Sequence, residues 1–180
     1  MHLRPLDILF ALTLLSRVCD LLSTWLVSPR LLLESNPIVR RFRWPFGFLT
    51  LGAAFLAYVQ PEMTVMLAVG SFLVAGNNCT KIAASRALGE QKLYENAITL
   101  AGSVPYWDGL VSRLAPVPCY LLLAGLIYFL CPSAQDWGNY IGTCVVIYSF
   151  VFTVYGTASY NRYRKLAKAA VPAVGEPTAT

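Results

Sequence analysis

The sequence predicts an all-α fold: a bundle of five transmembrane helices with one amphipathic helix at the membrane surface. Of the 180 residues, 57% are hydrophobic and only 13% are charged, whereas a soluble domain has about 25% charged residues. The mean hydropathy is +0.57, and the basic residues lie mostly between long apolar runs. A soluble domain this poor in charge could not cover its surface, so most of its apolar area must face lipid or other helices.

The first expected span covers residues 6–27. Arg4 followed by the mostly apolar run 8–15 is similar to the start of a secretory signal. However, Arg17-Val18-Cys19 lacks the small residues of a cleavage site, and the apolar run resumes after it. We therefore expect a retained transmembrane helix that ends at Ser28-Pro29.

A polar connector then leads to the second expected span, residues 45–59. Within the connector, Asn36-Pro37 is typical of an N-cap followed by proline at the first helical position. A short helix should begin there. Pro45 opens the second span, and residues 60–62 form a turn after it.

The third span is expected at residues 63–84. Its purely apolar part ends at Gly76, giving about 21 Å of helix, short of a hydrocarbon core of about 30 Å. The helix must therefore continue through Asn77-Asn78, which places both amides inside the membrane. The segment that follows is too polar to span. Residues 88–101 have the helical periodicity of an amphipathic helix that lies on the membrane surface or packs against the bundle.

The last two spans are expected at residues 110–131 and 138–160. Pro116 and Pro118 should kink the fourth span or delay its start. Residues 1–168 thus form a single transmembrane domain, and residues 169–180, which lack aromatic side chains, are expected to be a disordered tail.

The distribution of basic residues predicts the orientation. If the N-terminus is outside, the inside segments hold nearly all the basic residues and the outside segments hold only Arg4, which is the asymmetry that membrane insertion favours. The cytoplasmic side would then carry Arg30, Arg40, Arg41, Arg43, Lys81, Arg86, Lys92, Arg113 at the edge of the fourth span, Arg162, Arg164, Lys165 and Lys168. We expect a bacterial or archaeal cell membrane, with the C-terminus cytoplasmic.

A polar constellation lies within the first span. Arg17 and Asp20 are three residues apart and share a helical face, continued by Ser23 and Thr24. A lone charge there costs about 2.5–3.5 kcal/mol. Two interpretations remain open: an ion, proton or substrate site built on Asp20, or a neutralised structural pair that fixes the rotation of the helix.

Glu34 follows the first span and also allows two interpretations. It could return toward Asp20 as a second carboxylate, so that the two share a proton. Alternatively it favours the N-terminus of the helix that Asn36 caps, and then it needs no function.

Helix geometry could bring more polar groups to the same depth. Asn77, Asn78 and Lys81 lie in the inner half of the third span, level with Asp20 in the first. The hypothetical polar binding site therefore consists of Arg17, Asp20, Thr24, Glu34, Asn36, Asn77, Asn78 and Lys81. The hypothesis fails if Asp20 and Asn77 lie on helix faces that are not adjacent.

The pattern Asp20-x-x-Ser23-Thr24 followed by Glu34-x-Asn36-Pro37 resembles a pattern in an uncharacterised family of small prokaryotic multi-pass membrane proteins. The resemblance covers residues 8–60. It implies that Asp20, Thr24, Glu34, Asn36 and Pro37 act as a unit. The family brings no assigned activity, and Arg17 and the Asn77-Asn78 pair are not part of its pattern.

The composition restricts the function. The only histidine is His2, and the five cysteines form no CxxC pair, so we expect neither a metal site nor a cofactor. The basic residues form no stripe with interleaved aromatics, which argues against nucleic acid. The leading hypothesis is a non-enzymatic accessory or assembly component, with the bilayer and a protein partner or further copies of itself as partners. The alternatives are a small transporter or ion-binding protein, and an intramembrane enzyme with Asp20 and Glu34 as catalytic acid and base.

Overall fold

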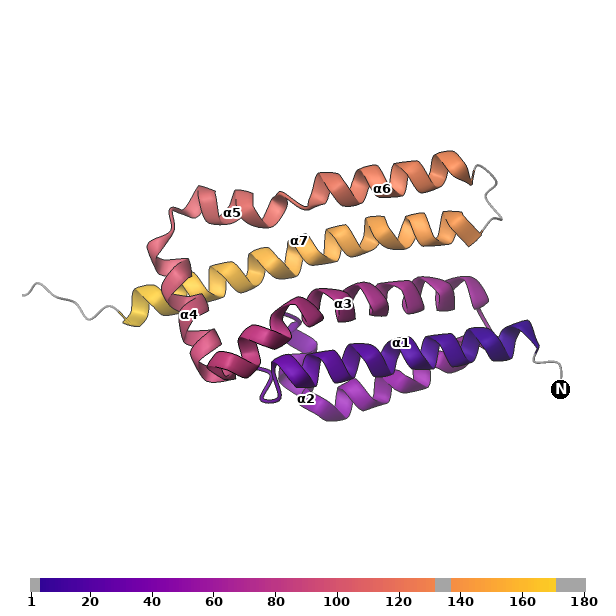
Figure 1. Cartoon of the computed structure of the whole chain (residues 1–180), viewed down its shortest axis with the longest axis horizontal. Helices are drawn as coiled ribbons and strands as arrows, with labels where there is room; N and C mark the ends of the chain where they lie inside the picture. The colour runs from indigo at the N-terminus through magenta and orange to yellow at the C-terminus, as the bar shows by residue number, and fades with distance from the viewer. Residues whose placement is uncertain (1–3, 132–136, 171–180) are drawn as a thin grey trace, which may run out of the picture.

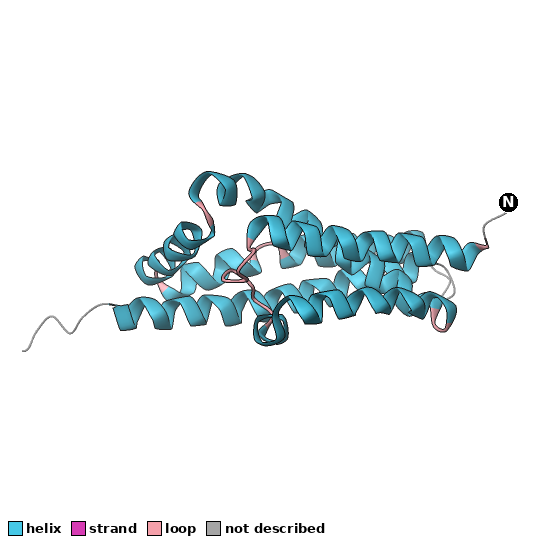
Figure 2. Ribbon diagram, turned by 90° about the horizontal axis from the view of Figure 1, so that it is seen from below, coloured by secondary structure: helices cyan, strands magenta, loops and turns pink. Residues whose placement is uncertain are grey.

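The computed structural model describes residues 4–131 and 137–170, and all regular structure in these two ranges is helical, as Figure 2 shows. This confirms the predicted all-α class. Three stretches are long and apolar enough to cross a membrane, judged by length and composition: α3 (Pro61–Leu88), the stretch Tyr106–Leu130, and α7 (Trp137–Ala170). The remaining elements are α1 (Pro5–Val27), α2 (Pro37–Leu49), the 3-10 helix η1 (Thr50–Tyr58), α4 (Glu90–Ser103), and α5 (Tyr106–Leu114) and α6 (Val117–Leu130), which share the second stretch.

The long helices lie side by side in the order α6, α7, α3 and α1, with η1 against α1 (Figure 1). The closest neighbours are α1 and α3, which bury small side chains: Thr13, Ser16 and Ser23 on α1, and Thr64, Ala68, Ser71 and Ala75 on α3. Small residues allow two helix backbones to approach closely. The Thr13 and Ser71 hydroxyls donate to carbonyls one turn earlier in their own helices, so their burial leaves no donor unpaired.

The second expected span is a composite of two kinds of helix. α2 is interrupted at Arg43, whose φ of 56° and ψ of −151° are non-helical, and the chain then continues through Pro45 into η1. A 3-10 helix rises about 2.0 Å per residue against 1.5 Å for an α-helix. The nine residues of η1 therefore extend about 18 Å rather than about 13.5 Å, which lengthens a segment with few residues.

The third helix is longer than the span expected at residues 63–84. It starts at Pro61, because proline is accommodated at a first helical position. It ends at Leu88, because Gly89 has a φ of 78° and turns the chain into α4.

The helix expected at residues 88–101 is α4, and it packs against the C-terminal half of α7. Ala101, Tyr160 and Tyr163 are buried together at this contact, and the Tyr94 and Tyr163 rings meet edge-on with their centroids 5.6 Å apart. α4 thus packs against another helix, which is one of the two placements that the amphipathic pattern allows.

The fourth expected span is divided into α5 and α6, which are separated by Ala115 and Pro116, as the prolines predict. α5 lies so close to α7 that a Cβ on Gly109 would come within 2.1 Å of the Tyr160 hydroxyl oxygen. α7 continues beyond residue 160 to Ala170, so the basic segment after the apolar run is helical. Of the expected tail, residues 171–180 lie outside the described residues.

The two ends of the bundle differ. At one end the chain segment between α1 and α2, hereafter the α1–α2 loop (residues 28–36), lies beside the start of α4 (Figure 1). There Arg162 donates to the Leu32 carbonyl oxygen over 3.3 Å. At the opposite end the Tyr58 hydroxyl donates to Asp7 over 3.0 Å.

Candidate functional site

Arg17 and Asp20 form an ion pair on α1, with 2.7 Å between Nη1 and Oδ2, and each side chain is only 14% exposed. Arg17 also donates from Nη1 to the Ser71 hydroxyl over 3.1 Å and from Nη2 to the Thr50 hydroxyl over 2.5 Å. The guanidinium group thus joins α1 to both α3 and η1.

Asn78 makes a second connection between α1 and α3. Its side-chain nitrogen donates to the Thr24 hydroxyl over 2.9 Å and to the Ser23 hydroxyl over 3.4 Å. Asn78 therefore lies against the polar face of α1 that Ser23 and Thr24 form. The neighbouring Asn77 forms a hydrogen bond through its backbone: its carbonyl oxygen accepts one from the Thr80 hydroxyl over 2.8 Å.

Glu34, Asn36 and Pro37 form a local unit at the start of α2. The Asn36 side chain accepts from the Ile38 amide over 2.9 Å, and Pro37 is the first helical residue, as the sequence predicts for an N-cap. The Asn36 amide in turn donates to Glu34 Oε1 over 2.7 Å. Glu34 therefore stabilises the turn into α2.

Glu34 also lies within electrostatic range of Asp20 and of Lys81. Nevertheless, no hydrogen bond or ion pair joins Glu34 to either side chain in the described part of the chain. The polar residues converge in part. Arg17, paired with Asp20 on α1, and Asn78, bonded to Thr24, make two separate connections between α1 and α3, and no hydrogen bond joins Glu34 or Lys81 to either of them among the described residues.

Glu90 is a structural residue that the sequence analysis missed. Its carboxylate accepts from the Arg30 amide over 2.9 Å, from the Leu32 amide over 2.8 Å, and from the Ser28 hydroxyl. Glu90 thereby holds the α1–α2 loop against the start of α4. The amphipathic pattern places Glu90 on a polar face, and no local signal connects it to a loop some sixty positions earlier.

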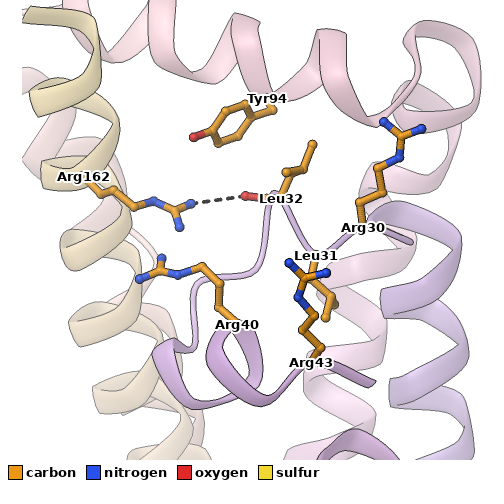
Figure 3. A pocket seen from close by; sticks show the side chains of 7 residues that line it. All are labelled: Arg30, Leu31, Leu32, Arg40, Arg43, Tyr94 and Arg162. Atoms are coloured by element: carbon orange, nitrogen blue, oxygen red, sulfur yellow. Dashed lines mark hydrogen bonds between the residues drawn. The ribbon is translucent and has the colours of Figure 1, made fainter. Parts of the chain in front are cut away.

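A basic pocket was also missed, because its residues come from four separate segments. It has a volume of about 170 Å³ and opens between the α1–α2 loop, α2, α4 and α7 (Figure 3). Its lining residues are Arg30, Leu31, Leu32, Arg40, Arg43, Tyr94 and Arg162. Their positions between apolar runs indicated determinants of topology, and nothing along the chain predicted that these arginines meet.

Within residues 4–131 and 137–170, no three His, Cys, Asp or Glu side chains are grouped so that they could hold a metal ion. The resemblance of residues 8–60 to a family of small membrane proteins stays a prediction. Comparison with protein families, with curated proteins and with solved structures finds no match to the chain.

Proposed function

We propose that this chain is a five-span membrane protein that acts by association, as an accessory or assembly component. The observation that carries the proposal is the bonding of Asp20, whose carboxylate is paired with Arg17 inside the contact of α1 with α3 and η1. An ion pair that joins three helical segments has a structural role that needs no substrate.

The five spans are the three apolar stretches together with α1 and the segment 45–59. The pairing of Arg17 with Asp20 supports α1 as a span, because a paired charge avoids much of the cost of a lone one in lipid. The 3-10 geometry of η1 supports the second span, because a 3-10 helix rises more per residue and a short segment can then cross more of the membrane. In this topology the N-terminus is outside, the C-terminus is cytoplasmic, and the membrane is that of a prokaryotic cell.

The other members of the polar group support the same function. Asn78 uses its amide to bind α1 to α3, and Asn36 caps α2. Amides and hydroxyls between membrane helices commonly act in this way, at about 0.6 kcal/mol per contact. Such groups stabilise one arrangement of the helices, which an accessory subunit needs in order to present a constant surface to its partner.

The proposal is tested by purifying the native complex in mild detergent and identifying what co-purifies. We expect a stoichiometric protein partner or a defined homo-oligomer. The matched variant is Arg17→Met with Asp20→Leu, which removes both charges and should retain the partner. A monomer without a protein partner, both in detergent and after cross-linking in membranes, would contradict the proposal.

One observation favours a second candidate function, ion or proton binding for transport. Glu34 is in electrostatic range of both Asp20 and Lys81, and clusters of ionisable groups within membranes commonly mark ion pathways. In that case Glu34→Gln and Asp20→Asn would each abolish proton or cation flux in proteoliposomes. The same carboxylates would carry the reaction of an intramembrane enzyme, the third class.

A further inference from the structure

The basic pocket at the loop end of the bundle has an unusual electrostatic composition. Four of its seven lining residues are arginines and none is acidic. Across the described ranges, the ion pair of Arg17 with Asp20 is the one salt bridge found, so no carboxylate lies within ion-pair distance of the pocket arginines. Four positive charges around one small cavity repel each other and create a strong preference for an anion.

Two of the four arginines come close together. Figure 3 shows the side chains of Arg40, from α2, and Arg162, from α7, directed toward each other beside Leu32. Arg162 uses Nη2 for the Leu32 carbonyl, whereas its Nε is buried and has no partner. A guanidinium group with unused donors matches the oxygens of a phosphate group, which it can bind through two parallel hydrogen bonds.

The backbone around the pocket includes two residues in strained conformations. Leu31 and Arg43 are the two non-glycine residues with positive φ in the described part of the chain, at 59° and 56°, and both line the pocket. Such conformations cost free energy and persist where the surroundings determine them, commonly at binding sites. Here Glu90 supplies the constraint on the loop through its bonds to the Arg30 and Leu32 amides.

A second cavity adjoins the first and could hold the part of a ligand that lies beyond its phosphate group. It has a volume of about 460 Å³ and shares Arg40 and Arg162 with the basic pocket. Lys165 adds a further positive charge, whereas Pro37 and Leu166 supply apolar surface. A ligand with a phosphate group and a larger, partly apolar remainder fits this pair of cavities.

We propose that the two adjoining cavities form a binding site for a phosphate group, carried either by an anionic phospholipid or by a small soluble phosphate compound. Arg40 and Arg162 hold the phosphate oxygens, and Arg30, Arg43 and Lys165 complete the positive field. The site does not involve Asp20 or Glu34, so it is independent of the function proposed above.

The test uses the full chain purified in detergent with two probes. Phosphatidylglycerol, compared with zwitterionic phosphatidylcholine, is measured by native mass spectrometry as lipid retained per chain. Inorganic phosphate, compared with chloride at equal ionic strength, is measured by isothermal titration calorimetry. The test variant is Arg40→Gln, because the Arg40 side chain has no hydrogen-bond partner among the described residues that would be lost. The matched control is Arg41→Gln, which removes the same charge from the next residue of α2, outside both cavities.

We expect Arg40→Gln to weaken binding of at least one probe about tenfold or more, because it removes a charge-assisted hydrogen bond. Arg41→Gln should change the same affinity less than about threefold, because a surface charge outside the cavities acts on the ligand only through screened electrostatics. Arg162→Gln should resemble Arg40→Gln, with thermal unfolding in detergent used to confirm that the variant is folded. Retention of phosphatidylglycerol alone identifies a lipid headgroup as the source of the phosphate, and binding of inorganic phosphate alone identifies a soluble compound. Equal weakening by Arg40→Gln and Arg41→Gln, or no binding of either probe, overturns the proposal.

Discussion

Replacing Arg17 by methionine should destabilise the protein more than replacing Asp20 by asparagine. With Arg17→Met, the Asp20 carboxylate keeps no other hydrogen-bond partner among the described residues, and breaking a buried pair in this way costs about 3–5 kcal/mol. With Asp20→Asn, Arg17 still has the hydroxyls of Ser71 and Thr50 as acceptors, so the cost should be about 1–3 kcal/mol.

The double variant shows whether the loss of stability comes from leaving one buried charge unpaired or from removing the polar groups themselves. Arg17→Met with Asp20→Leu removes both charges, and it leaves Ser71 and Thr50 bonded to the carbonyls of Leu67 and Gly47. Replacing a complete buried pair by apolar residues is often neutral or stabilising. We therefore expect the double variant to be more stable than Arg17→Met alone by about 2 kcal/mol or more, given coupling energies of up to about 3 kcal/mol between contacting residues.

The assay is equilibrium unfolding in mixed detergent micelles with increasing sodium dodecyl sulfate, followed by circular dichroism. The cycle consists of the unchanged protein, Arg17→Met, Asp20→Leu and the double variant, and Asp20→Asn is measured beside them. Ser16→Ala serves as a control for a small change on the same helix. The reasoning is refuted if the double variant loses as much stability as Arg17→Met and Asp20→Leu added together, or if Arg17→Met is as stable as the unchanged protein.

Three further predictions concern the packing of the bundle. Gly109→Ala should lower the thermal unfolding temperature in detergent, because its Cβ would meet the buried Tyr160 ring, and such overpacking costs about 1–3 kcal/mol; an unchanged temperature would show that α5 does not pack as described. Glu90→Gln should speed proteolysis within the α1–α2 loop, since a carboxylate that accepts three hydrogen bonds there is replaced by a weaker acceptor; equal cleavage rates in limited proteolysis would count against this role. Asn78→Ala should lower stability in the same denaturant titration by only about 0.6 kcal/mol, the usual value of one hydrogen bond between membrane helices, here to Thr24; a loss of several kcal/mol would mean that the amide does more than join two helices.

The sequence was most informative where a local rule determines the structure. The N-cap at Asn36 and the break near Pro116 both follow from the chemistry of single residues. The pairing of Arg17 with Asp20 follows from helical spacing alone. These features could be predicted because the groups involved are neighbours along the chain.

Features that depend on long-range contacts could not be predicted in this way. The bonds of Glu90 to the α1–α2 loop and of Arg162 to Leu32 join residues 58 to 130 positions apart. Apolar periodicity shows which face of a helix is buried but not which segment covers it. The basic pocket could therefore not be predicted as a site, although each of its arginines is recognisable in the sequence as a basic residue.

The account depends most on the topology, because the association proposal needs five spans and the phosphate site needs all its basic residues on one side of the membrane. The most direct measurement is labelling of single cysteines introduced at positions 41, 60 and 168 in a cysteine-free variant, with a membrane-impermeant maleimide applied to intact cells. We predict that position 60 reacts from outside, and that positions 41 and 168 react only after the cells are opened. Labelling of position 41 from outside while position 168 stays protected would contradict the five-span arrangement.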